Sequence, residues 1–197
     1  MRTPKIEALH RLITWYNNRY NTTIPLLGVD LEPISNNSWL SGFIEADGSF
    51  YLNYKFNKND MLIGIVYYLR ISQKQTYTRK IDSNINVSNL PHMEQIGELL
   101  NTKVTNIVRH KENYVEKAFE VRTDKLVSKL QLFDYLNKFP LFGYKYYSHI
   151  NLEKIHKLVI NKEYKTIEGK NKILDYKSLM KYNEQYTWEH IQNFYLK

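Results

Sequence analysis

One stretch decides the fold: Trp39-Leu-Ser-Gly-Phe-Ile-Glu-Ala-Asp-Gly-Ser-Phe-Tyr51. Its apolar residues recur at helical spacing and predict a short helix with one apolar face: Trp39, Leu40, Phe43 and Ile44. Gly42 and Ala46 lie four residues apart on a neighbouring face, where small side chains let another backbone come close. We therefore expect a second element to approach this helix closely.

The end of the same helix carries negative charge. Glu45 and Asp47 fall in its last turn, and Gly48 is placed to end the helix as its C-cap. The helix dipole disfavours anions at that end by about 0.3–1 kcal/mol each. The placement therefore indicates that something positive, such as a divalent metal ion, lies there.

The nonamer Leu40-Ser-Gly-Phe-Ile-Glu-Ala-Asp-Gly48 resembles the LAGLIDADG motif of homing endonucleases and intron maturases over its whole length. Its Ser, Phe and Glu are common variants of that motif. An ordinary core helix with a polar end would explain the nonamer alone, so the order of the downstream elements has to decide between the two interpretations.

That order supports the resemblance. Strands are predicted at 49–57, 61–72, 103–110 and 116–123, and helices at 91–100, 125–139 and 146–161. Helix, two strands, helix, two strands and two helices predict an α+β domain in which helices cover one face of a four-stranded antiparallel sheet. This topology is similar to the half-saddle of the LAGLIDADG family, and the similarity covers about residues 38–160.

The rest of the chain flanks this domain on both sides. Residues 1–37 are predicted to form a helix over 5–20 and a Pro-containing linker, and residues 161–197 a charged loop over 162–172 and a helical tail. The opening Arg-Thr-Pro-Lys also resembles the segment between the two halves of double-motif family members, which would make this chain a C-terminal half. A short helix on the outside of one domain is the alternative.

Composition restricts the partners. A chain of 197 residues with 43% hydrophobic residues fits one domain, or one domain with extensions. The net charge of +8 and pI of about 9.4 suit a polyanion such as nucleic acid, although a merely basic soluble protein would show the same charge. The chain has no cysteine, which excludes disulfides and thiolate metal sites.

Location is suggested only weakly by the sequence. No apolar run is long enough to span a bilayer, and the first residues lack the apolar core of a secretory signal. The many Asn, Lys, Tyr and Ile residues have A/T-rich codons, which hints at an organellar, mitochondrial gene. We expect no membrane partner.

The resemblance implies a catalytic set. Asp47 matches the acidic residue that binds Mg²⁺, a hard cation that prefers oxygen ligands, and backbone carbonyls at the helix end could add ligands. Gln73 matches the polar residue that contacts the catalytic water, and Lys145 the cation that stabilises the transition state. Glu45 is assigned to capping or pairing. The alternatives are a polar strand end for Gln73 and a surface lysine for Lys145.

A single motif implies a partner, because family members join two motif helices so that one acidic residue from each meets at the symmetry axis. We expect a homodimer or pairing with a half on another chain. The predicted contact residues are Leu40, Gly42, Phe43 and Ala46. Packing of the small residues against the chain's own helices is the alternative.

The solvent face of the sheet is the predicted surface for nucleic acid. Its candidates can donate to phosphates and base edges: Tyr51, Asn53, Lys55, Tyr68, Arg70, Arg109 and Arg122. The scattered histidines form no metal pattern and are assigned surface or cap roles. The first function is site-specific cleavage of double-stranded DNA. The alternatives are an RNA-splicing maturase that binds structured RNA and a non-catalytic subunit of a nucleoprotein assembly, for example a mitochondrial ribosome.

Overall fold

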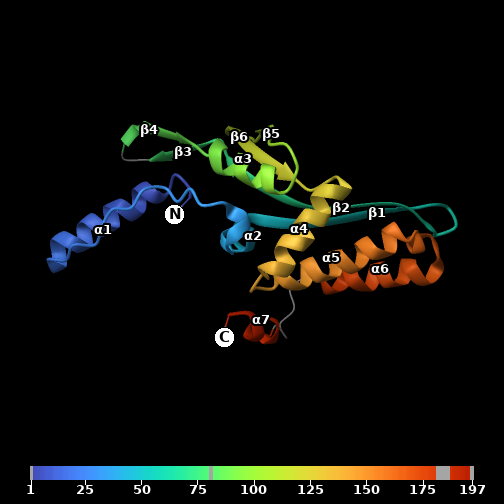
Figure 1. Cartoon of the computed structure of the whole chain (residues 1–197). Helices are drawn as coiled ribbons and strands as arrows, with labels where there is room; N and C mark the ends of the chain where they lie inside the picture. The colour runs from blue at the N-terminus through green and yellow to red at the C-terminus, as the bar shows by residue number, and fades with distance from the viewer. Residues whose placement is uncertain (1, 80–81, 181–186, 196–197) are drawn as a thin grey trace.

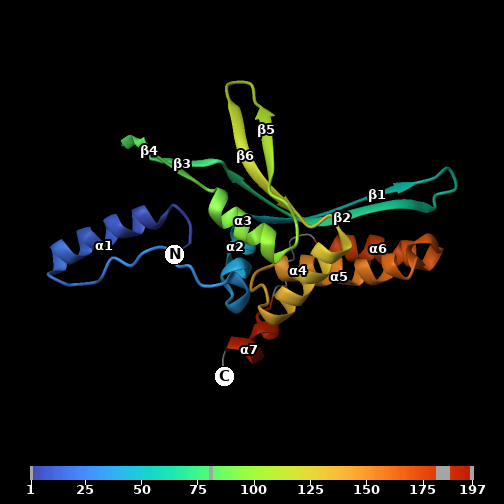
Figure 2. The same cartoon turned by 45° about the horizontal axis from the view of Figure 1, so that its top comes forward.

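The computed structural model describes residues 2–79, 82–180 and 187–195 of the chain. Its centre is a four-stranded antiparallel sheet in the order β1 (Gly48–Phe56), β2 (Leu62–Lys74), β6 (Val115–Arg122) and β5 (Thr105–His110). The predicted strands and fold class are thereby confirmed. In Figure 2 the β1–β2 and β5–β6 hairpins extend from this centre in different directions.

Alternation along the strands gives the sheet two different faces. On β1, Gly48 and Leu52 are buried whereas Tyr51, Asn53 and Lys55 are exposed. Antiparallel pairing sets Tyr51 opposite Tyr68 on β2, so both side chains stand on the open face. The opposite face is covered by helices.

Four helices cover that face: α2 (Trp39–Asp47), α3 (Leu90–Leu99), α4 (Leu126–Lys138) and α5 (Lys145–Ile160). They lie on one side of the long β1–β2 hairpin or beside its base (Figure 1). Two clusters of buried apolar residues hold them. One joins α2, α3 and α4 to the base of the sheet, and the other joins α5 to the β1–β2 hairpin.

A second hairpin, β3 (Thr76–Arg79) with β4 (Asp82–Ser88), forms a separate two-stranded sheet that the sequence did not predict. It follows directly on β2, and hydrogen bonds fix its base. The Gln75 amide donates to the Lys117 carbonyl at 3.0 Å, and the Asn89 amide donates to the Gln75 carbonyl at 2.9 Å. The hairpin therefore extends the sheet region toward the N-terminal side (Figure 2).

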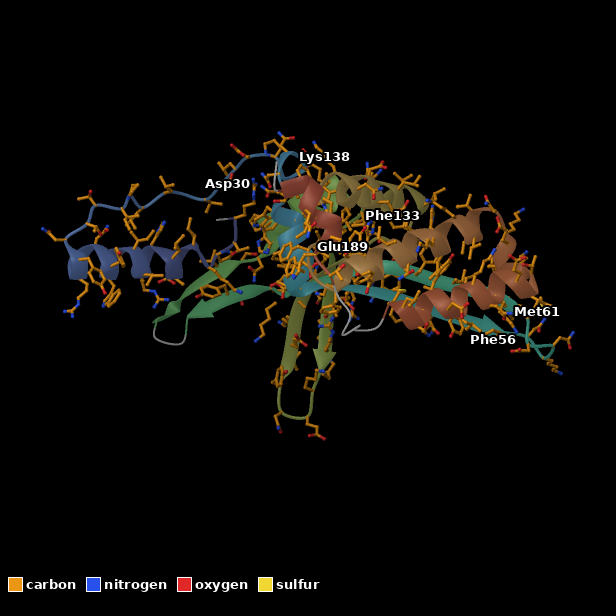
Figure 3. The ribbon with its side chains drawn as sticks, turned by 90° about the horizontal axis from the view of Figure 1, so that it is seen from below. Asp30, Phe56, Met61, Phe133, Lys138 and Glu189 are labelled. Atoms are coloured by element: carbon orange, nitrogen blue, oxygen red, sulfur yellow. The ribbon has the colours of Figure 1, made fainter. Side chains whose placement is uncertain are left out.

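The charged segment predicted as a loop is largely helical, which corrects the sequence interpretation. A 3-10 turn, η2 (Glu163–Lys165), leads into α6 (Ile167–Leu179). The Thr166 hydroxyl caps α6 by accepting a hydrogen bond from the Gly169 amide at 3.0 Å, and Ile173 is fully buried. The helix lies beside α5 and continues that layer along the β1–β2 hairpin, whose tip carries Phe56 and Met61 (Figures 1 and 3). The last described element is a short helix, α7 (Glu189–Tyr195), and residues 181–186 and 196–197 of the predicted tail lie outside the described residues.

The N-terminal arm, residues 2–33, extends away from the sheet (Figure 1). Its helix α1 (Ile6–Tyr20) has no buried residue, and Trp15 and Tyr20 are more than half exposed. The arm packs on itself, because His10 hydrogen-bonds the Leu27 carbonyl at 2.7 Å. The short turn η1 (Ile34–Asn36) then leads into α2. No described helix is long and apolar enough to cross a membrane.

Candidate active site and nucleic-acid interface

The motif helix α2 has two different faces. Leu40 and Ile44 are fully buried in the core, and the Leu40 amide donates to the Tyr135 hydroxyl at 3.1 Å. On the same side the Ser41 hydroxyl donates to the Phe139 carbonyl at 2.5 Å. The prediction that Leu40 contacts a partner is therefore wrong, because its side chain is fully buried in the core of its own chain.

The other face of α2 is open. Trp39 and Phe43, predicted to share one face with Leu40 and Ile44, stack on each other here with ring centroids 4.9 Å apart. Ala46 is exposed, and a Cβ built on Gly42 would meet no atom within 4 Å. The two small residues thus do not serve the chain's own packing.

A positive group does lie at the end of α2, and it belongs to the protein. The Lys145 ammonium donates to the Ile44 carbonyl at 3.0 Å and to the Glu45 carbonyl at 2.6 Å. Burial lowers the pKa of Lys145, an effect that Glu45 and Asp47 partly oppose. Both carbonyls therefore bind a cation of the chain itself, at the helix end where the sequence suggested a positive group.

Glu45 has the supporting role that the sequence indicated. Its Oε1 accepts a hydrogen bond from the Gly143 amide at 2.7 Å, just before α5 begins. A Cβ on Gly143 would lie only 2.6 Å from Glu45 Oε2, so a larger residue there would displace the Glu45 carboxylate. Glu45 and Lys145 together tie the end of α2 to the start of α5.

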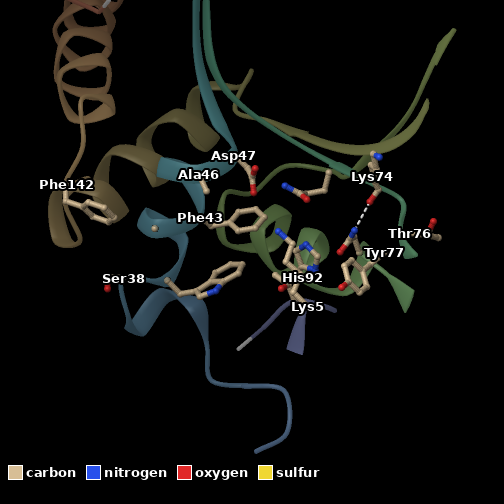
Figure 4. A pocket seen from close by; sticks show the side chains of 15 residues that line it. Lys5, Ser38, Phe43, Ala46, Asp47, Lys74, Thr76, Tyr77, His92 and Phe142 are labelled. Atoms are coloured by element: carbon tan, nitrogen blue, oxygen red, sulfur yellow. Dashed lines mark hydrogen bonds between the residues drawn. The ribbon is translucent and has the colours of Figure 1, made fainter. Parts of the chain in front are cut away.

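Asp47 is exposed at the last position of α2, and no hydrogen bond or ion pair joins it to another described residue. It lines a cleft of about 590 Å³ together with Gly42, Phe43, Ala46 and Gln73. In Figure 4 the Asp47 carboxylate lies at one end of this cleft, and Ser38 lies at the other end. The structure thus brings Asp47 and Gln73 to one cleft. Lys145 does not line this cleft and instead binds two carbonyls in the last turn of α2.

The fit to a divalent metal is that of half a site. No group of three or more His, Asp or Glu side chains that could hold a metal occurs among the described residues. Asp47 supplies a carboxylate at this cleft that no described residue binds. Mg²⁺ is commonly held by one or two carboxylates together with substrate phosphates and water. Asp47 fits that pattern only if a second carboxylate and the substrate supply the remaining ligands.

Three histidines assigned to the surface are buried. His92 lines the cleft with its ring edge toward Phe43, centroids 5.8 Å apart, and burial lowers its pKa to about 4. Burial likewise lowers the pKa of His149 to about 4, and both ring nitrogens of His149 lack a hydrogen-bond partner. His156 accepts or donates a hydrogen bond with Tyr67 at 2.8 Å. The helical spacing of His149 and His156 on α5 could have indicated their burial.

All seven residues predicted for nucleic acid point to the open side of the sheet, although one of them, Tyr68, is buried and only 9% exposed. The register sets Arg70 opposite Arg122, and Tyr51 stacks on Tyr68 with centroids 4.8 Å apart. Arg122 lies over the Tyr68 ring at 5.3 Å. The face is therefore an aromatic and cationic surface that runs across β1, β2, β6 and β5.

The sequence interpretation missed Glu120, which lies among these cations. Its side chain is 1% exposed and binds Arg122 at 2.5 Å and Arg109 at 3.2 Å. Burial lowers the pKa of Arg122, but the hydrogen bond and charge of Glu120, together with Tyr68 and Asp124, raise it above its ordinary value. Strand alternation from Arg122 could have placed Glu120 on this face, because the two residues are two positions apart.

Comparisons with known proteins agree with this geometry. The LAGLIDADG endonuclease family model matches residues 40–156, more than half of the chain. "Intron-encoded DNA endonuclease aI3" of Saccharomyces cerevisiae is 27% identical over 100% of this chain and 53% of its own length. "Probable intron-encoded endonuclease 4" of Neurospora crassa is 32% identical over 83% of this chain and 26% of its own. The chain thus spans about half or less of these curated relatives.

Solved structures show the same fold. The LAGLIDADG homing endonuclease I-LtrWI bound to target DNA matches with a TM-score of 0.55 and 20% identity over 82% of this chain and 49% of that chain. The homing endonuclease I-TnaI matches with a TM-score of 0.51 and 21% identity over 84% of this chain and 96% of that chain. The motif, the fold and the family match together place this chain in the LAGLIDADG endonuclease family.

Proposed function

We propose that this chain is one half of a homing endonuclease that hydrolyses double-stranded DNA at a specific site with Mg²⁺. The observation that carries the proposal is the exposed, unpaired Asp47 at the end of α2, beside the open face of Gly42 and Ala46. A carboxylate left without a partner in its own chain is suited to a shared site. A divalent metal there would activate water and absorb charge on the phosphate.

The second half completes this site. Gly42 leaves the outer side of α2 empty, so the backbone of another motif helix can approach it, and Phe43 and Ala46 would flank the contact. A related helix in that position would bring its own acidic residue next to Asp47. In a solution that contains this chain alone, the second half would be a second copy of the same chain. The solved homing endonuclease I-TnaI is a chain of similar extent, because the match covers 96% of its length.

The other two residues act around Asp47. Gln73 lines the same cleft from the end of β2 and would orient the attacking water through its amide. Lys145 holds the last turn of α2 through two carbonyls, and its ammonium adds positive charge near Asp47. Both therefore support a carboxylate that the fold has placed at the cleft.

Double-stranded DNA is the polyanion that the open sheet face suits best. The face has stacked tyrosines and several arginines, and twisted antiparallel strands can follow the major groove. Among the solved neighbours, I-LtrWI is bound to target DNA and the meganuclease I-AabMI is bound to uncleaved DNA. Fungal relatives named as intron-encoded support an organellar, mitochondrial gene.

The test is cleavage of a pool of random DNA duplexes by the purified chain with Mg²⁺, followed by sequencing of the double-strand ends. We expect specific ends from the wild-type chain and from Asp134→Asn, which changes an exposed aspartate on α4. Asp47→Asn should give no specific ends while still binding DNA.

Two results would overturn the proposal. Normal cutting by Asp47→Asn would remove the carboxylate from the reaction. No cutting by the wild-type chain, together with tight and salt-sensitive binding to structured RNA, would favour the maturase or the assembly subunit.

A further inference from the structure

The open face of the sheet carries a buried carboxylate where DNA would bind. Glu120 points to the same face as Arg122 and Ser72, because the register pairs Ser72 with Glu120 and Arg70 with Arg122. Its side chain is 1% exposed. A negative charge on a surface for a polyanion opposes binding, so its presence there needs a reason other than affinity.

Its contacts supply that reason. One oxygen of Glu120 binds Arg122 Nε at 2.5 Å, and the other binds Arg109 Nη2 at 3.2 Å. Glu120 therefore acts as a common anchor for cations on two adjacent strands.

The two anchored arginines differ in what they have left to offer. Arg109 uses both terminal nitrogens, because Nη2 also donates to Ser72 at 3.2 Å and Nη1 pairs with Glu116 at 3.5 Å. Arg122 gives only Nε to Glu120, and its two terminal nitrogens bind no other described residue. Its side chain remains 40% exposed.

Arg122 is also held from a second side. Its guanidinium carbon lies 5.3 Å from the centre of the Tyr68 ring, and Tyr68 in turn stacks on Tyr51. A guanidinium fixed through Nε and one flat face presents a pre-oriented pair of terminal N–H groups. That fork matches the O6 and N7 acceptors of guanine in the major groove.

We propose that Arg122 reads a guanine in the target and that Glu120 is the positioning residue that holds its fork. Arg109 is a buttress in this arrangement and contributes little to base choice. The inference rests on the proposed function, since it requires that the open face binds DNA. It adds which arginine discriminates between base pairs and which buried carboxylate makes it do so.

The test selects binding sites from a pool of random DNA duplexes with EDTA present, so that no duplex is cut. The guanine position that Arg122→Lys no longer selects is then varied to all four base pairs, and a Kd is measured for each. We expect Arg122→Lys to lose about 5- to 100-fold in discrimination at that position, because lysine keeps the charge and loses the fork.

Glu120→Gln should lose discrimination at the same position and by up to the same factor, while its affinity for non-specific DNA rises. Glu116→Gln is the matched control, because it removes the same charge from the same face of the same strand and touches only Arg109 of the two arginines. It should raise non-specific affinity equally and leave base choice unchanged. Circular dichroism checks that each variant is folded.

The possible failures can be told apart. A wild-type chain that selects no DNA sequence overturns the proposed function, and this inference with it. A selecting wild-type chain whose preferences survive Arg122→Lys, or survive Glu120→Gln, overturns the inference alone. If Glu120→Gln does not fold, Tyr68→Leu removes the other support of the fork, and unchanged base choice in that variant is the overturning result.

Discussion

The two faces of α2 differ although they belong to one nine-residue helix. The core face is filled, with Leu40 and Ile44 fully buried and Ser41 hydrogen-bonded to Phe139. On the open face, a Cβ added to Gly42 would meet no atom within 4 Å, and Ala46 is exposed. Trp39 and Phe43 stack on each other there and pack partly against the core. The core face stabilises this chain, whereas the open face is the one that we propose contacts a second motif helix.

The largest expected effect on folding comes from the core face. Ile44→Ala should lower the free energy of unfolding by about 2–5 kcal/mol, because it leaves a cavity where no atom is exposed. Phe43→Leu on the open face should cost less than about 1.5 kcal/mol in the isolated chain. Urea unfolding of both variants gives the comparison, and equal losses would mean that the faces are not distinct.

Acid should weaken the core next. In the folded chain the pKa of His92 and of His149 is about 4, against 6.5 for an ordinary histidine. The unfolded chain therefore binds more protons between pH 6.5 and pH 4, and stability falls as pH falls through that window, by up to about 3 kcal/mol per histidine.

The variants His149→Leu and His92→Leu separate these two contributions. Each should flatten part of the fall in stability, measured by denaturant unfolding from pH 7 to pH 4. His92 lies beside the open face of α2. If a second chain binds there, the contribution of His92 to the fall in stability should depend on protein concentration. The contribution of His149 should not depend on protein concentration. A concentration dependence found only for His149 would contradict pairing through the open face of α2.

Lys145 binds the C-terminal end of α2, where the core face and the open face of the helix both end. Lys145→Met keeps the aliphatic stem and removes the ammonium from the Ile44 and Glu45 carbonyls. We expect a loss of about 1.5–3 kcal/mol, the range for hydrogen bonds to charged groups. Lys58→Met, in the exposed turn between β1 and β2, is the control and should change thermal unfolding little.

The smallest effects have opposite signs at two glycines of the motif. A Cβ on Gly48 would lie 2.8 Å from both the Ile44 carbonyl oxygen and its Cγ2, so Gly48→Ala should destabilise the chain by about 1–3 kcal/mol. Gly42→Ala should stabilise it by about 1 kcal/mol, because alanine is the better helix former and the site is empty. Thermal unfolding of the two variants measures both, and a loss at Gly42 would show that the chain itself uses the open face.

The sequence was sufficient for the four strands of the main sheet and for the helices between and after them, because alternation in β1 and helical spacing in α2 are local patterns. It missed the β3–β4 hairpin and the helix α6. It did not separate the two faces of α2, since Trp39 and Leu40 are equally apolar and only tertiary packing decides which one is buried. Lys145 lies about a hundred positions along the chain from the carbonyls that it binds, so no local pattern connects them. Glu120 was overlooked because the residues considered on this face were the cations and tyrosines around it. The charged segment 162–172 looked like a loop because the fully buried residue of α6, Ile173, lies just beyond it and is a weak signal on its own.

The most direct test of the central claim is the mass of the chain in solution, measured by light scattering for the wild type and for Gly42→Leu. Gly28→Leu is the control, because a Cβ added to Gly28 would also meet no atom within 4 Å, whereas this glycine lies in the linker. We predict a wild-type chain and a Gly28→Leu variant that pair, and a Gly42→Leu variant that is folded, at least as stable and monomeric. A Gly42→Leu variant of unchanged mass, or a wild-type chain that stays monomeric at every concentration, would contradict pairing through the open face of α2.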